Sequence, residues 1–198
     1  MFRSRLLALL TALALAATLV PLAQGALVRV RVEGKTATLF GASEPRASGA
    51  NPLEALESAS VAGEFYYHVT PTSFGPYVDQ IGRYAGSEST GWVFKVNGVS
   101  PPVGADKVEL KDGDTVLWYH ATFGPTGGPP TLHLSRAAGG CYRVAARDDA
   151  GKALDTTGVF LQVDGRIVRT QAGRACPGPH RGLVKAVRGG YVRSNALP

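Results

Sequence analysis

The stretches GWVFKVNG (residues 91–98) and DGDTVLWY (residues 112–119) are the most informative part of this chain. In each, alternating apolar residues lie beside an Asn-Gly or Asp-Gly pair. Such pairs favour the positive-φ turns that match the twist of paired strands. Both tryptophans of the chain, Trp92 and Trp118, lie in these stretches. We therefore expect neighbouring strands joined by tight turns.

The residues around these stretches predict further strands and one helix. Valines alternate with arginines at 28–32, which is the period of a half-buried strand. A helix is expected from Asn51, because Asn51 can cap it, Pro52 suits its first turn and Glu54 can reach back to the cap. Gly63 ends it. Other strands are expected at 36–40, 65–69, 77–84, 92–96, 107–110 and 115–120. One main helix packed on one face of a sheet is an α+β design.

The order and spacing of several short motifs resemble a known family. The motifs are NPLEAL (51–56), GPYV (75–78) with Ile81, the 91–98 stretch, and KDGD (111–114) before Trp118. Over residues 28–123 the chain resembles the C-terminal β-domain of transcobalamin and intrinsic factor, and bacterial relatives of unknown function. The resemblance implies a β-grasp fold and a binding module rather than an enzyme.

The same resemblance suggests a ligand. In transcobalamin a helical toroid makes much of the corrin contact, and no such toroid is present in this sequence. The resemblance therefore implies at most a corrinoid-like ligand held in a composite site with a partner, or a different ligand altogether. From the residues alone we expect no cofactor, and no histidine can be assigned to cobalt.

The first 25 residues have the pattern of a secretory signal peptide. Arg3 and Arg5 precede an apolar run at 6–20, Pro21 ends the run, and AQG at 23–25 offers small residues for cleavage. The alternative is an uncleaved anchor, although the run is shorter than the roughly 20 apolar residues of a spanning helix. We expect a secreted or cell-surface protein with no later transmembrane segment.

Charge divides the rest of the chain. The formal net charge is +6, and residues 26–133 contain 8 basic and 11 acidic residues against 11 and 4 in residues 134–198. Between these parts, GPTGGPP (124–130) suits neither a helix nor a ladder. We expect a β-grasp domain at 26–126, a linker at 127–131 and a small basic domain at 132–198.

The second domain is expected to be all-β and sandwich-like. Its clearest signal is Asp164-Gly165 between two alternating runs, 159–163 and 166–170, which predicts a hairpin. Further strands are expected at 142–146 and 183–187. The core of so small a unit is thin. Cys141 and Cys176, the two cysteines of the chain, are expected to form a disulfide in an oxidising environment.

Few residues suggest catalysis. Cys176 and His180 have a metal-like spacing, and Cys141 offers a third ligand, but a structural zinc site needs four. We expect the disulfide, with a metal or free thiols as the alternative. The sequence holds no Gly-x-Ser-x-Gly elbow and no phosphate loop. The aspartate pairs at 112/114 and 148/149 lie in turn sequences. We therefore expect a protein that is not an enzyme.

Aromatic residues concentrate in the first domain. If the helix covers only one face of the sheet, some of them must face water or a partner, and exposed aromatic clusters mark binding sites. The alternative is that the tryptophans and Phe94 are simply core. Three tyrosines suit a half-wet patch better, because a phenol tolerates such a place. The candidate ligand-binding residues are Tyr66, Tyr84, Trp92, Phe94, Trp118 and Tyr119.

Three functions remain open from the sequence. The favoured one is an exported, non-catalytic binding module that contacts a small molecule or another surface protein. The second is a structural adaptor whose basic C-terminal domain holds an anionic envelope polymer. The third is a hydrolase with an unrecognised site. Nucleic acid is not expected as the partner of an exported chain.

Overall fold

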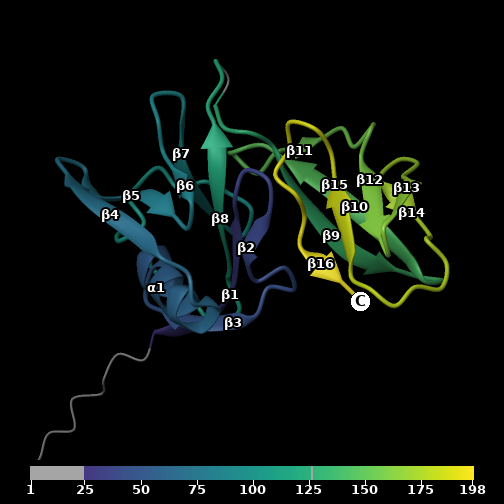
Figure 1. The fold of residues 1–198 in the computed structure, drawn as a ribbon, viewed down its shortest axis with the longest axis horizontal. Coiled ribbons are helices and arrows are strands. Elements are labelled where there is room, and N and C mark those ends of the chain that lie inside the picture. Colours follow the sequence, from purple (N-terminus) through teal and green to yellow (C-terminus); the bar gives the residue numbers. More distant parts are fainter. Residues whose placement is uncertain (1–24, 126) are drawn as a thin grey trace, which may run out of the picture.

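Figure 1 shows the computed structural model, which describes residues 25–125 and 127–198. Strands make up 48% and helix 7% of it, in several sheets with a β-sandwich-like arrangement. The expected α+β β-grasp fold with one main helix is therefore wrong. The helix has only 12 residues, so it covers part of one sheet face while strands cover the rest. Apart from Gly25, the predicted signal peptide lies outside the described residues.

The first half of the described chain contains eight strands and the helix α1 (Pro52–Gly63). In chain order, the strands are β1 (Ala26–Glu33), β2 (Thr38–Phe40), β3 (Arg46–Gly49), β4 (Tyr67–Thr72), β5 (Gly75–Ile81), β6 (Tyr84–Ala85), β7 (Thr90–Val96) and β8 (Thr115–Thr122). The predicted strand at 107–110 does not form. The predicted strand at 77–84 is divided between β5 and β6.

The two tryptophan-containing stretches, 91–98 and 112–119, lie side by side. β7 pairs antiparallel with β8, and Phe94 is opposite Trp118. β8 continues into a parallel pairing with β1, so the larger sheet runs β2-β1-β8-β7, with β3 also paired to β1. A smaller sheet contains β4, β5 and β6. β7 is therefore an edge strand of the larger sheet.

The helix forms as its sequence predicts. The Asn51 side chain accepts a hydrogen bond of 3.0 Å from the Glu54 N–H, and the Glu54 carboxylate accepts one of 2.8 Å from the Ala50 N–H. These bonds satisfy main-chain donors that a helix start leaves free. After Gly63, Glu64 adopts a left-handed conformation with φ 50° and ends the helix. The buried residues Ala55, Leu56 and Ala59 pack on the larger sheet.

The second half, residues 127–198, contains strands and no helix. The strands are β9 (Thr131–Ala137), β10 (Cys141–Arg147), β11 (Ala153–Leu154), β12 (Phe160–Val163), β13 (Arg166–Arg169), β14 (Arg174–Ala175), β15 (Val184–Val187) and β16 (Ala196–Leu197). They form two sheets of four around one apolar cluster. The predicted hairpin is confirmed: β12 and β13 pair across Asp164 (φ 46°) and Gly165 (φ 72°).

The larger sheet lies between two different layers. Val28, Val30 and Val32 are fully buried on the face that carries α1. Arg31 and Glu33 alternate with them and face the second half, which lies beside β1 and β8 in Figure 1. The sequence pattern suggested that the arginine side of β1 faces water. This is wrong for Arg31, because the second half covers it and leaves it 3% exposed.

The predicted linker is held in place by main-chain contacts. Gly124 and Gly127 exchange hydrogen bonds of 3.0 and 3.2 Å, and Thr131 already belongs to β9. The boundary between two domains near residue 130 stays a prediction, although each half has its own cluster of buried residues. No helix in the described part of the chain is long and apolar enough to cross a membrane.

Candidate functional site

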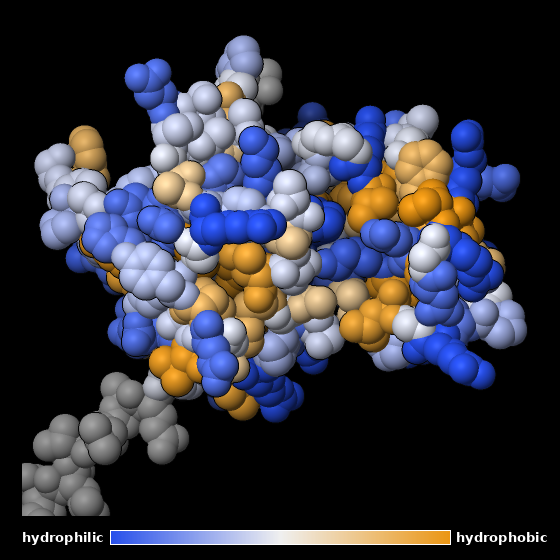
Figure 2. Space-filling model, in the orientation of Figure 1, coloured by the Kyte–Doolittle hydropathy of each residue, from blue (hydrophilic) through white to orange (hydrophobic). Residues whose placement is uncertain are grey.

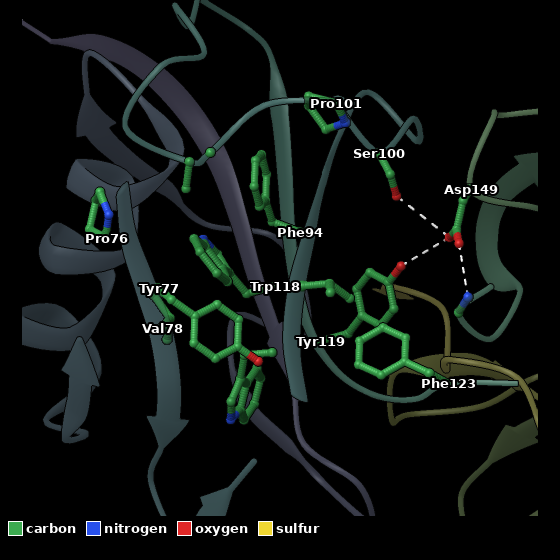
Figure 3. Close-up of a pocket in the computed structure, with 15 residues that line it drawn as sticks. Pro76, Tyr77, Val78, Phe94, Ser100, Pro101, Trp118, Tyr119, Phe123 and Asp149 are labelled. Atoms are coloured by element: carbon green, nitrogen blue, oxygen red, sulfur yellow. Dashed lines mark hydrogen bonds between the residues drawn. The ribbon is translucent and has the colours of Figure 1, made fainter. Parts of the chain in front are cut away.

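An apolar pocket lies at the β7 edge of the larger sheet (Figure 3). Its volume is about 290 Å³. β5 lines one side with Pro76, Tyr77 and Val78, and the loop from Ser100 to Ala105 lines another. Figure 3 shows the Tyr77 ring directed from β5 toward the rings on β7 and β8. Pockets of this size and apolar character suit small ligands.

Four of the six predicted aromatic residues line this pocket: Trp92, Phe94, Trp118 and Tyr119. The tryptophans also belong to the core, since the Trp92 indole N–H donates to the Tyr84 carbonyl at 2.7 Å and that of Trp118 to the Pro52 carbonyl at 3.1 Å. The two tryptophans are therefore both core residues and pocket-lining residues. Each tryptophan has one part packed in the core and another part at the pocket wall.

The two remaining predicted residues lie elsewhere. Tyr66 is 59% exposed but does not line the pocket. Tyr84 is half-buried; its hydroxyl lies 2.7 Å from that of Thr36, and the Arg83 guanidinium stacks over its ring. Conversely, the exposed aromatics Tyr77 and Phe123 line the pocket and were not predicted. Their exposure depends on how the smaller sheet of β4, β5 and β6 packs against the larger one. The sequence pattern carries no information about this packing.

The expectation that Tyr119 is half-exposed is wrong. Tyr119 is 1% exposed because it lies on the sheet face covered by the second half. Its hydroxyl donates a hydrogen bond of 3.2 Å to Asp149, which also accepts from the Gly128 N–H at 3.0 Å. The Ser100 hydroxyl lies 3.5 Å from the same carboxylate. Asp149 thus forms the polar end of the pocket, as Figure 3 shows.

A buried lysine, Lys95, lies next to Asp149 at this polar end. Lys95 is fully buried, and its Nζ lies 3.3 Å from Asp149 Oδ1 and 2.7 Å from the Asp148 carbonyl. Burial lowers the pKa of Lys95, and the Asp149 carboxylate opposes that shift. Burial on its own would raise the pKa of Asp149. The hydrogen bond from the Gly128 N–H and the charge of Lys95 lower it by more, so the pKa of Asp149 lies below its ordinary value. Burial raises the pKa of Tyr119 well above its ordinary value.

These shifts define the charge state of the pocket at neutral pH. Asp149 is ionised and paired with Lys95, while Tyr119 keeps its hydroxyl proton. Among the described residues, those that line the pocket include no lysine, arginine or histidine. The site therefore combines aromatic walls with one anchored carboxylate, which suits recognition more than proton transfer.

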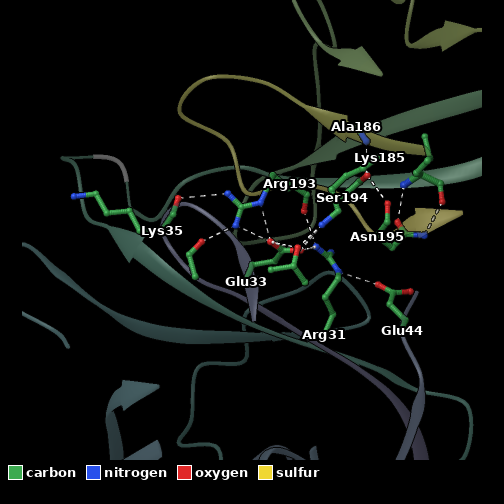
Figure 4. Close-up of polar contacts among 12 residues, drawn as sticks. Arg31, Glu33, Lys35, Glu44, Lys185, Ala186, Arg193, Ser194 and Asn195 are labelled. Carbon is green, nitrogen blue, oxygen red and sulfur yellow. Dashed lines mark hydrogen bonds and ion pairs between the residues drawn. The ribbon is translucent and has the colours of Figure 1, made fainter. Parts of the chain in front are cut away.

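A second polar cluster joins the two halves (Figure 4). Glu33 is 1% exposed and accepts from Arg31 Nη1 at 3.1 Å, Lys185 Nζ at 3.2 Å and Arg193 Nε at 2.9 Å. Arg31 also donates to Glu44 at 3.2 Å and to the Arg193 carbonyl at 2.6 Å. The central carboxylate, Glu33, pairs with one cation of the first half and two of the second, so this cluster joins the halves.

Histidines form pairs that sequence reasoning missed. His68 Nδ1 lies 2.7 Å from Asp79 Oδ1, and the Thr70 hydroxyl donates to Asp79 Oδ2 at 2.6 Å. To activate a nucleophile, His68 would need a hydroxyl or thiol side chain hydrogen-bonded to it. No such hydrogen bond to His68 occurs in the described residues. His180 Nε2 bonds the Tyr142 hydroxyl at 3.0 Å. No group of three or more metal-ligating side chains occurs in residues 25–125 and 127–198.

The predicted disulfide is confirmed. Cys141 and Cys176 are bonded, and they join the start of β10 to the residue after β14. Bonded sulfurs are not available as thiolate ligands, which excludes the metal and free-thiol alternatives for this pair.

Comparison with known proteins gives a partial match. Residues 49–122 match a family described as Domain of unknown function (DUF4430). The match begins just before α1 and ends with β8, so it includes the aromatic strands of the pocket and none of the second half. It does not confirm the transcobalamin-like resemblance. No curated protein matches the chain.

Proposed function

We propose that this protein is an exported, non-catalytic binding module whose ligand site is the pocket between β5 and β7. The observation that carries the proposal is the convergence of aromatic side chains from three strands on one pocket with a single anchored carboxylate. Export is supported by the leader-like sequence at 1–25 and by the disulfide, since disulfides persist in oxidising compartments.

The size of the pocket limits the ligand. A volume of about 290 Å³ is at the lower end for small-molecule sites. A corrinoid-like ligand, suggested by the transcobalamin resemblance, would place only part of itself here and would need a partner protein for the remainder. A compact apolar ligand or a short segment of another surface protein fits this volume better.

Tryptophan fluorescence tests the proposal, because Trp92 and Trp118 line the pocket and the chain has no others. Purified protein is titrated with cobinamide, cobalamin, haem and flavin, and with short apolar peptides. Saturable quenching or a spectral shift by any of these supports a ligand site. If no probe changes the spectrum, the pocket is not a ligand site.

A pair of variants locates the response. Tyr77 lines the pocket, whereas Phe74 is an exposed aromatic of the same hairpin outside it. Tyr77→Ala is expected to weaken binding about fivefold to tenfold, by loss of one aromatic contact. Phe74→Ala is expected to leave it unchanged. Equal effects of both variants would place the ligand outside the pocket.

A second candidate function rests on the basic surface of the second half. Of the eleven lysines and arginines in residues 134–198, Lys185 and Arg193 pair with Glu33, and the other nine make no ion pair within the described part of the chain. Arg143 and Arg174 lie directly opposite each other on β10 and β14. Like charges in that position repel, and an anionic partner would relieve the repulsion. Figure 2 shows hydrophilic side chains projecting from this half.

This surface would make the protein an adaptor to an anionic envelope polymer. The full chain is passed over an acidic polymer column, with the Arg143→Gln/Arg174→Gln variant as comparison. The expected result is retention at low salt, lost near 0.15 M because exposed charges are screened over about 8 Å there, and weaker retention of the variant. Retention that neither salt nor the variant changes would contradict an electrostatic contact.

A further inference from the structure

The main-chain groups of β7 point alternately toward β8 and away from it. Asn97 donates to the Thr115 carbonyl at 2.9 Å and Phe123 donates to the Ser89 carbonyl at 2.9 Å, so the odd-numbered residues make the bonds to β8. Antiparallel pairs alternate in this way along their whole length. The N–H and C=O groups of the even-numbered residues therefore face outward.

The two ends of this outward edge are already bonded. Thr90 exchanges hydrogen bonds of 2.8 and 3.3 Å with Ser87, and Val96 exchanges bonds of 2.9 and 3.0 Å with Val99. Between them remain Trp92 and Phe94, whose outward main-chain groups have no hydrogen-bond partner in the described residues. Both residues line the pocket. The pocket thus contains a two-residue length of strand edge that has no strand partner in the described residues.

We propose that this pocket binds a short extended apolar peptide, which adds as a strand to the Trp92–Phe94 edge of β7. The proposal rests on the proposed function, because it names the ligand class of the same pocket. Two outward residues of a strand present their N–H and C=O pairs about 7 Å apart. An extended peptide repeats the same pairs at the same spacing, so both residues are satisfied at once.

The pocket walls and charges agree with such a ligand. Side chains of an added strand point alternately to the two sides, and Tyr77, Trp118 and Phe123 provide apolar contacts in the pocket. Beside the lining residue Gly104, Asp106 Oδ1 is buried and has no hydrogen-bond partner among the described residues, while Asp106 Oδ2 pairs with Lys107 at 2.9 Å. An amino group of the peptide could donate to Oδ1, whereas a peptide carboxylate could not.

The length of the free edge limits the peptide. Because the Ser87–Thr90 and Val96–Val99 bridges close the edge on both sides, only two or three peptide residues find main-chain partners. The source is either a free short peptide or an exposed segment of another protein. Both sources present the same main-chain chemistry.

Amide NMR on the full chain tests the hydrogen bonds directly. The probes are tripeptide amides with a free amino terminus, built from valine, isoleucine, leucine, phenylalanine and tyrosine. Binding is expected to slow exchange of the Trp92 and Phe94 amide protons at least about tenfold. The Val93 and Lys95 amides, already bonded to β8, are the internal control and are expected to change little.

Backbone methylation of the same peptides separates strand addition from simple apolar binding. Residues one and three of the tripeptide face Trp92 and Phe94, so methylating the amide nitrogen of residue three is expected to weaken binding about tenfold, the value of one lost hydrogen bond. Equal binding of methylated peptides, or unchanged Trp92 and Phe94 exchange in a bound complex, would overturn strand addition and leave the pocket as a ligand site. If peptides fail while a small molecule binds, the peptide class is wrong; if every probe fails, the proposed function fails too.

Peptide length distinguishes the two sources. The tightest tripeptide is embedded between five-residue polar flanks on both sides. Retained affinity indicates a segment of another protein, and a loss of more than about tenfold indicates a free short peptide.

Discussion

The two faces of the larger sheet are buried by different physics. On the α1 face, valines of β1 meet small apolar helix residues, and this contact needs no particular partner geometry. On the other face, Arg31, Glu33 and Lys95 are buried by the second half and must find matched charges. A buried charge is tolerable only when it is paired and hydrogen-bonded. The apolar face therefore tolerates change, whereas the polar face depends on every partner.

The largest expected effect is at the centre of the polar face. Glu33→Ala leaves Arg31, Lys185 and Arg193 without their shared acceptor, and breaking a buried pair in this way costs about 3–5 kcal/mol. Denaturant unfolding measures the loss. Glu44→Ala is the control, since Glu44 pairs with Arg31 alone and is more exposed. If both variants lose the same stability, the central position of Glu33 does not matter.

Reduction of the disulfide is expected to rank next. The bond spans a sequence separation of 35, and constraint of the unfolded chain gives about 3–4 kcal/mol. Both tryptophans lie in the first half, in the apolar cluster beside α1. Reductant is therefore expected to lower the midpoint seen by far-UV circular dichroism more than the one seen by tryptophan fluorescence. Equal shifts would mean that the polar face couples the halves into one cooperative unit.

Removal of Asp149 is expected to cost less, because this carboxylate is about a third exposed and Lys95 keeps its bonds to the Asp148 carbonyl and Thr131. We expect a loss of about 2 kcal/mol for Asp149→Ala. The Lys95→Met/Asp149→Ala double variant is expected to recover most of it, since no cation is then buried alone. A double variant as unstable as the sum of the two single changes would show that the pair does not interact.

The smallest expected effect lies on the α1 side. Burial and the Glu57 carboxylate, to which the Tyr67 hydroxyl donates, raise the pKa of Tyr67 to about 12. The folded state then holds the proton longer than the unfolded chain does, so this contribution is present below pH 10 and is lost as the pH rises from about 10 to 12. Absorbance at 295 nm follows the titration. Glu57→Gln is expected to bring the pKa down, and an unchanged titration would contradict the role of Glu57.

The sequence predicted local features well. The Asn51 cap, the Gly63 helix end and the Asp164-Gly165 hairpin depend on residues within one turn of each other, so their physics is contained in a few neighbouring positions. The disulfide was predictable because Cys141 and Cys176 are the two cysteines of a chain with a leader-like start. Four of the six aromatic candidates line one pocket, because strand periodicity places Trp92 and Phe94 on one side of β7; their role in binding stays a prediction.

The sequence by itself thus determined which residues share a face, and only the tertiary structure decided what covers each face. Alternation along β1 separates valines from Arg31 and Glu33, but the same pattern describes a strand with one face in water. The β-grasp expectation failed for this reason, since strands dominate both halves and the second half covers the sheet face that the expectation left open. Burial of Tyr119 and exposure of Tyr77 follow from the same long-range packing. Contacts between β1 and residues about 160 positions later leave no periodic trace in either segment.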